Sequence, residues 1–184
     1  MITTLKLPFT FDIEPLRADV ERFAQEEWSP HFNQGVYDGD WSGVPLRTAG
    51  SSPLPLYPDP TSSDWYDTDQ MHRCEYVPEV VAAFNCDKEA VRFLRLGPGA
   101  EIREHRDYML NIDDGVARVH IPIVTSEHVT FTLAHNVVPM QPGEAWYLDF
   151  NEPHSVKNDG DEYRVHLVID LIANEWLRSF FPAE

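Results

Sequence analysis

Three side chains of this 184-residue chain have the types and the order of a mononuclear metal site. His105 and Asp107 are separated by one residue, and His154 lies 47 positions after Asp107. Residues i and i+2 of an extended segment project the same way, so the first two can converge on one ion, and a distant strand can add the second imidazole. Two imidazoles and one carboxylate form a facial triad with three open positions. This ligand set suits Fe(II) or Mn(II) better than structural zinc.

An arginine follows these residues, because Arg164 lies ten positions after His154. The planar guanidinium of arginine binds a carboxylate through two parallel, charge-assisted hydrogen bonds. The order of the four residues resembles the iron- and 2-oxoglutarate-dependent dioxygenases, in which such an arginine binds the distal carboxylate of 2-oxoglutarate. The resemblance implies Fe(II) as the metal, 2-oxoglutarate as co-substrate and O2 as oxidant.

Four longer segments make the resemblance narrower, and together they cover about residues 76–172. They resemble, in the same order, motifs of the aspartyl/asparaginyl beta-hydroxylase family, which includes bacterial cis-proline hydroxylases. This resemblance implies that His105, Asp107 and His154 are the iron ligands and that Arg164 holds the C5 carboxylate of 2-oxoglutarate. The four segments are residues 91–107, 118–124, 142–149 and 154–170.

The resemblance also implies roles for two further polar residues. His120 would help to bind 2-oxoglutarate, and Arg118 would face a substrate carboxylate. They occupy positions i and i+2 of one predicted strand, so they share a face, as two groups lining one cavity must. Trp41 and Arg47 are candidate substrate contacts, because they lie in a long irregular segment and such segments often cover binding sites.

The elements that must position these residues are mainly β-strands. Short alternating patterns separated by glycine and proline turns indicate a sandwich or a barrel. The resemblance narrows this to a double-stranded β-helix, a jelly-roll and cupin-like fold with flanking helices. The predicted strands comprise residues 91–96, 117–124, 129–133, 145–150 and 163–171.

The length favours a single 2-oxoglutarate dioxygenase domain over residues 1–184. Helical patterns at 12–27 and 78–84 predict an N-terminal part of helices and loops. Four prolines within ten residues interrupt any regular element after residue 50, and a structureless connection of this length is often a lid. The expected parts are residues 1–90 (helices and loops), 35–70 (substrate-covering loop), 91–172 (jelly-roll core) and 173–184 (C-terminal helix).

The charge balance restricts the partners. With 14 Lys and Arg against 31 Asp and Glu, the net charge is −17, and it repels phosphate backbones and anionic membranes. No apolar stretch has the roughly 18 residues of a membrane span. Cys74 and Cys86 are too few for a disulfide framework, and the first residues lack a signal-peptide pattern, so we expect a cytoplasmic protein.

These observations favour an enzyme that hydroxylates an amino acid or an aminoacyl or peptide side chain. Decarboxylation of 2-oxoglutarate to succinate would accompany the hydroxylation. Two alternatives remain open at this point: a cupin-like metalloenzyme that does not use 2-oxoglutarate, and a non-catalytic metal-binding β domain. The sequence leaves open the substrate, the position and stereochemistry of hydroxylation, and the oligomeric state.

Overall fold

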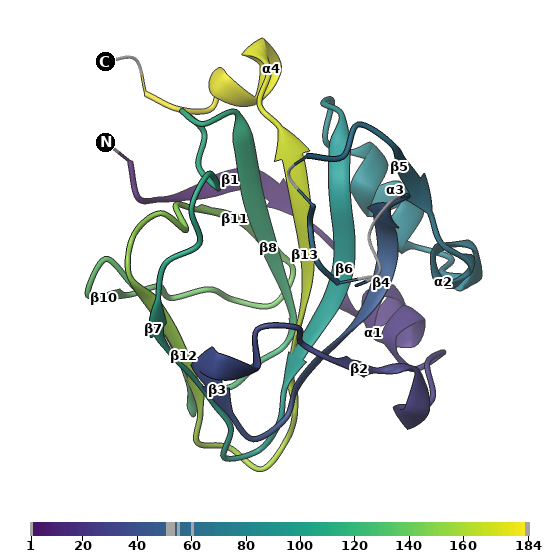
Figure 1. Ribbon diagram of the computed structural model, residues 1–184, viewed down its shortest axis with the longest axis vertical. Helices are drawn as coiled ribbons and strands as arrows, with labels where there is room; N and C mark the ends of the chain where they lie inside the picture. Colours follow the sequence, from purple (N-terminus) through teal and green to yellow (C-terminus); the bar gives the residue numbers. More distant parts are fainter. Residues whose placement is uncertain (1, 51–53, 55, 60, 183–184) are drawn as a thin grey trace.

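The computed structural model describes residues 2–50, 54, 56–59 and 61–182. These residues form two antiparallel β-sheets that face each other, with short helices outside the larger sheet (Figure 1). The mainly β fold expected from the sequence is confirmed.

The larger sheet has eight strands and contributes Arg92, Arg118, His120 and Arg164 to the cavity described below. Its strand pairs are all antiparallel, and β5 (Trp65–Asp67) pairs with β4 outside the main path. In spatial order the other strands are β1 (Thr4–Thr10), β11 (Glu144–Leu148), β8 (Val116–Val124), β13 (Arg164–Ile172), β6 (Lys88–Leu96), β4 (Trp41–Ala49) and β2 (Ser29–Pro30).

The smaller sheet has five strands and is also antiparallel throughout. Two neighbouring inner strands of this sheet each have a predicted metal ligand at one end, and their pairing brings these two ligands together. In spatial order the strands are β10 (Asn136–Val137), β9 (Val129–Leu133), β12 (His154–Asn158), β7 (Glu101–His105) and β3 (Tyr37–Asp38).

Short helices cover the outer face and one end of the larger sheet (Figure 1). Asp12 is the N-cap of the first helix, because its side chain accepts a hydrogen bond from the amide of Glu14. That helix is shorter than the 12–27 pattern predicts and ends at Val20. The helical elements are α1 (Ile13–Val20), η1 (Gln25–Glu27), η2 (Gln34–Val36), α2 (Asp69–Arg73), α3 (Val77–Ala82) and α4 (Glu175–Arg178).

Two hydrophobic cores lie on opposite faces of the larger sheet. Phe93 belongs to the core beneath the helices, and the next residue, Leu94, belongs to the core between the sheets. This alternation is that of a strand buried on both sides. The core between the sheets is the smaller one, and polar side chains of the site occupy part of the same space.

The N-terminal part differs from the expected arrangement of helices and loops. Residues 4–10 and 41–49 are strands of the larger sheet, and the expected loop at 35–70 contains β3, β4 and β5. Pro45 hid β4 from the sequence pattern, but the register shifts between Pro45 and Arg47, and a proline is tolerated at such a bulge. Residues 51–53, 55 and 60 of the expected loop lie outside the described residues.

The jelly-roll strands agree closely with their predicted ranges, although β6 begins at Lys88 rather than at residue 91. The expected C-terminal helix is α4, and residues 183–184 lie outside the described part of the chain. Among the described residues, no helix is long and apolar enough to cross a membrane.

Candidate metal centre and its cavity

The three predicted metal ligands converge where the two central strands of the smaller sheet meet. His105 ends β7, His154 begins β12, and the two residues are directly paired across the strands. Asp107 follows β7 and is anchored by its amide, which donates to the carbonyl of Phe150 at 2.9 Å. One potential ligand atom from each of the three residues lies within 4.8 Å of the others.

Both histidines are oriented by backbone carbonyls. Nδ1 of His105 lies 2.8 Å from the carbonyl oxygen of Arg103, and Nδ1 of His154 lies 3.0 Å from that of Glu152. A carbonyl only accepts, so each Nδ1 carries the proton and each Nε2 has a free lone pair. Burial lowers the pKa of His154 to about 4, which keeps it in the neutral form that binds metals at neutral pH.

Asp107 presents one oxygen to the histidines and the other to an arginine. Its Oδ1 lies 3.7 Å from Nε2 of His105, and its Oδ2 accepts a hydrogen bond of 3.2 Å from Nη1 of Arg118. The arrangement leaves one carboxylate oxygen for a cation. A ligand oriented in this way by a neighbouring donor is common at metal sites.

Arg118 belongs to a buried cluster around Asp170. Its Nε and Nη2 donate to the two oxygens of Asp170 at 2.7 and 3.0 Å, and Nη1 of Arg92 donates to the same carboxylate at 3.0 Å. Burial alone would raise the pKa of Asp170, but the guanidinium groups of Arg118 and Arg92 lower it to about 2. Three of the five donors of Arg118 are therefore engaged within the protein, and two remain for a ligand.

Arg164 is a buried cation without an acidic partner. It is 2% exposed, its Nη2 lies 2.8 Å from Nδ1 of His166, and its Nε has no hydrogen-bond partner. Within the described part of the chain, no carboxylate lies within ion-pair distance of it. Burial lowers its pKa to about 9, so it is still protonated at neutral pH. An unpaired buried charge is costly unless an anion binds to it.

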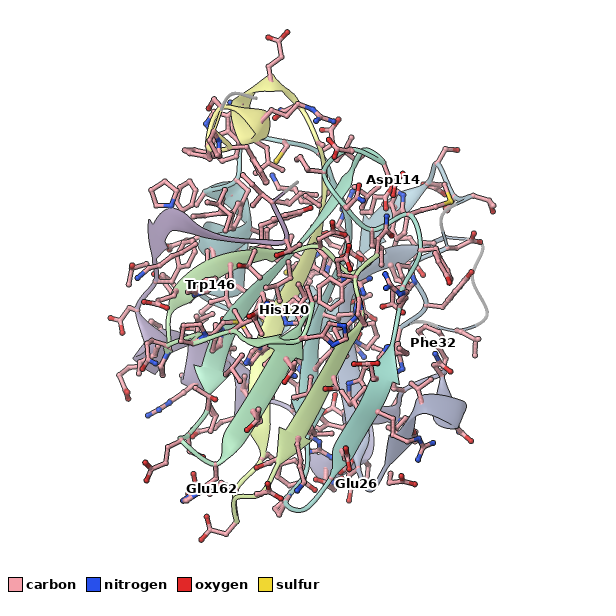
Figure 2. All side chains as sticks on the ribbon, turned by 90° about the vertical axis from the view of Figure 1, so that its left-hand side faces the viewer. Glu26, Phe32, Asp114, His120, Trp146 and Glu162 are labelled. Atoms are coloured by element: carbon pink, nitrogen blue, oxygen red, sulfur yellow. The ribbon has the colours of Figure 1, made fainter. Side chains whose placement is uncertain are left out.

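His120, like Arg164, contacts His166. Its Nδ1 lies 3.2 Å from Nδ1 of His166, and its ring stacks on Phe150 with centroids 5.2 Å apart. Burial, together with the charge of Arg164, lowers the pKa of His120 well below its usual value. Figure 2 shows His120 in the middle of the molecule, between the two sheets.

Most of the side chains described above line one cavity of about 440 Å³. The triad, Arg118, His120, Arg164 and Trp41 all line it, so the structure brings together seven of the eight predicted site residues. Apolar side chains of the core between the sheets form much of the remaining wall. These include Leu94, Ile102, Phe131, Phe150 and Val156.

The two predicted substrate contacts have different positions. Trp41 lines the cavity and stacks on His31, with ring centroids 3.5 Å apart. Arg47 does not line it, and the expectation for this residue needs correction. β4 pairs Arg47 with Asp67 of β5, and the guanidinium bonds that carboxylate at 2.8 Å, beside a separate cavity.

Several residues of the cavity were not predicted from the sequence, among them His31, Arg92 and Glu89. His31 is buried against Trp41, and burial lowers its pKa to about 2. For Arg92 a signal existed, since an arginine within the apolar run 91–96 must be buried with a partner or a ligand. No sequence pattern indicated Glu89.

The sequence of this chain is similar to those of known hydroxylases. The family model described as aspartyl/asparaginyl beta-hydroxylase matches residues 10–174. An L-proline cis-4-hydroxylase of Rhizobium meliloti is 33% identical over 57% of this chain and 38% of its own length. An L-proline cis-3-hydroxylase of a Streptomyces species is 28% identical over 87% of this chain and 57% of its own length. The chain thus spans about 38% to 57% of the length of these two relatives.

Solved structures support the fold. A protein of Burkholderia pseudomallei, described as an oxidoreductase of the 2OG-Fe(II) oxygenase family, superposes with a TM-score of 0.60. The superposition covers 94% of this chain and 88% of that protein, at 16% sequence identity. At this identity the likeness concerns the jelly-roll architecture alone.

Proposed function

The chain belongs to the aspartyl/asparaginyl beta-hydroxylase family, and we propose that it is an Fe(II)- and 2-oxoglutarate-dependent hydroxylase. In this reaction O2 and 2-oxoglutarate are consumed, a C–H bond of the substrate becomes C–OH, and succinate and CO2 are released. One observation carries the proposal. The unpaired guanidinium of Arg164 and the three clustered ligand atoms of the triad line the same cavity.

The donor set fits a hard to borderline divalent cation. Nε2 of His105, Nε2 of His154 and Oδ1 of Asp107 would hold the metal, since the other polar atoms of these side chains are engaged. When bound, Fe(II) supplies the activation of O2 that no side chain provides. Two imidazoles and one carboxylate leave positions open for a bidentate co-substrate and for O2.

Arg164 would hold the distal carboxylate of 2-oxoglutarate, and His120 would help to bind the same molecule. Both are almost fully buried, and burial favours a charge-assisted hydrogen bond over its solvated alternative. His166 orients the guanidinium by accepting a hydrogen bond from its Nη2. The apolar walls formed by Phe131 and Phe150 would exclude water from the reacting groups.

We propose a small amino acid or an aminoacyl group as the substrate. The two curated relatives are both named as L-proline hydroxylases, which supports this class. A cavity of about 440 Å³ suits a ligand of this size beside 2-oxoglutarate. Arg118 has two free donors for a substrate carboxylate, and Trp41 offers an aromatic surface in the same cavity.

The variant Arg164→Ala tests the proposal. We expect its affinity for 2-oxoglutarate to fall at least a hundredfold, because a buried charge-assisted contact is lost, while Mn(II) still binds. The measurement is calorimetric titration of 2-oxoglutarate into the Mn(II)-loaded protein, together with an assay of succinate formation. Arg73→Ala is the control, because Arg73 is an exposed arginine paired with Glu27 outside the cavity. Unchanged 2-oxoglutarate affinity and succinate formation in Arg164→Ala would contradict the role of Arg164. A folded, metal-loaded wild type that neither binds 2-oxoglutarate nor forms succinate would favour a metalloenzyme that does not use this co-substrate.

A further inference from the structure

One acidic side chain lines the cavity without a partner. Glu89 is half-buried, and no other described residue donates a hydrogen bond to its carboxyl or forms an ion pair with it. The other two acidic residues of the cavity wall are engaged. Asp107 bonds Arg118, and Asp114 accepts a hydrogen bond of 2.6 Å from Asn151. Among the described residues, Glu89 is thus the acidic group of the wall that has no hydrogen-bond or ion-pair partner within the protein.

A β-bulge turns Glu89 into the cavity. Where β13 pairs with β6, Ile169 faces Val91 and Leu171 faces Lys88, so Asp170 faces two residues of β6. In a regular strand Glu89 and Val91 would share a face, and Val91 is buried in the core beneath the helices. The extra residue reverses the alternation, as bulges next to binding sites often do.

The surroundings of Glu89 disfavour the ionised form of its carboxyl group when no cation is bound to it. Burial and the nearby charge of Asp170 raise the pKa of Glu89 to about 7, although Arg118 acts in the opposite direction. A bound cation would favour the ionised form and compensate its lost hydration. A metal ion is not the expected cation, because Glu89 is not one of the clustered potential ligands.

The same strand presents a positive group to the same cavity. Arg92 lies three residues after Glu89, bonds Asp170 through Nη1 only, and has a buried Nε without a partner. A cavity wall with an unpaired carboxyl and a guanidinium that has spare donors is complementary to a zwitterion. Free α-amino acids are small zwitterions, whereas peptide-bound residues and N-acylated amino acids have lost the ammonium charge.

We infer that Glu89 is a specificity-determining residue that accepts hydrogen bonds from the ammonium group of a free amino-acid substrate. This inference rests on the proposed function, since the amino acid would bind next to the metal and 2-oxoglutarate. Glu89 would then select between substrates, although it is not one of the three metal ligands. A substrate without the charged nitrogen would leave the desolvated carboxyl of Glu89 unpaired, and sites of this kind reject such analogues strongly.

The test uses the full chain loaded with Mn(II) and 2-oxoglutarate, in which no turnover occurs. A panel of free L-amino acids, L-proline included, and their N-acetyl derivatives is titrated by calorimetry into wild type and Glu89→Gln. We expect wild type to bind its best amino acid at least tenfold more tightly than the N-acetyl form. Glu89→Gln should lose at least tenfold in affinity for the free amino acid and little for the N-acetyl form.

Glu79→Gln is the matched control, because Glu79 is exposed on α3 and does not line the cavity. Equal affinity of wild type and Glu89→Gln for the free amino acid would overturn the inference. Binding of N-acetyl derivatives only, or of no member of the panel, would overturn it too. Failure of the proposed function is a separate result, because folded wild type would then not bind 2-oxoglutarate in the first titration, before any amino acid is added.

Discussion

At the scale of single residues, Arg118 acts on the geometry of the site, because its hydrogen bonds hold the side chain of a proposed metal ligand in place. It bonds Oδ2 of Asp107 and both oxygens of Asp170, so it fixes the direction in which Asp107 presents Oδ1 to a cation. Its expected contact with a substrate carboxylate would use the two donors that remain. The same side chain would then connect the metal ligand to the substrate.

The variant Arg118→Lys tests this positioning role. A single ammonium group cannot reproduce the bidentate contact with Asp170 and also reach Asp107, so the orientation of the carboxylate ligand should be lost. We expect Mn(II) affinity to fall about 10- to 100-fold, measured by titration with electron paramagnetic resonance detection. Arg73→Lys, at an exposed ion pair, should bind Mn(II) as wild type does. Wild-type affinity in a folded Arg118→Lys protein would show that Arg118 does not position Asp107.

At the scale of elements, strands with regular apolar alternation are predictable from the sequence. The ranges 117–124 and 129–133 agree with β8 and β9 to within one residue, because apolar residues alternate throughout both strands and Pro122 of β8 falls at one of the intervening positions. β4 was not predictable, because Gly43 and Pro45 break its pattern and its strand conformation depends on pairing with β2, β5 and β6. Tertiary pairing overrides local preference at such positions.

Tertiary pairing also limits which residues of the site can be predicted from the sequence. Four site residues could be predicted because their order along the sequence resembles the motif order of a known family. They are His105, Asp107, His154 and Arg164, and the structure places them around one cavity. Glu89 could not be predicted, because the bulge that turns it inward depends on the register between β6 and β13. Register is a property of two distant segments and leaves no local pattern.

At the scale of the whole molecule, charge is divided between surface and interior. The net charge is −17, yet the cavity contains the guanidinium groups of Arg92, Arg118 and Arg164. The overall field does not attract anionic ligands, so local hydrogen-bonding geometry must capture them. Four neutral histidines lie buried in the same interior, namely His31, His120, His154 and His166.

These histidines predict loss of stability on acidification. Burial lowers the pKa of His154 to about 4 and that of His31 to about 2, while His120 and His166 also lie well below their usual value. Between about pH 6.5 and pH 4 the unfolded chain therefore binds more protons than the folded one, and the free energy of unfolding rises with pH. Each histidine contributes at most about 1.4 kcal/mol per pH unit.

Glu89 contributes with the opposite sign, because its folded-state pKa of about 7 lies above the usual value, and the stability it adds is lost as the pH rises through 7. The histidines outnumber it, so we expect the metal-free protein to be less stable at pH 5 than at pH 7. Urea unfolding at pH 5, 6 and 7 in the presence of a chelator measures the difference. Equal or greater stability at pH 5 would contradict the burial of neutral histidines.

In the proposed function, the triad and Arg164 together bind Fe(II) and 2-oxoglutarate in one cavity. The most direct measurement is an anaerobic titration of the wild-type protein, first with Fe(II) and then with 2-oxoglutarate, followed by visible absorption. We expect a weak metal-to-ligand charge-transfer band that grows with 2-oxoglutarate and saturates at one equivalent per iron. A folded, iron-loaded protein that develops no such band would contradict the proposed function.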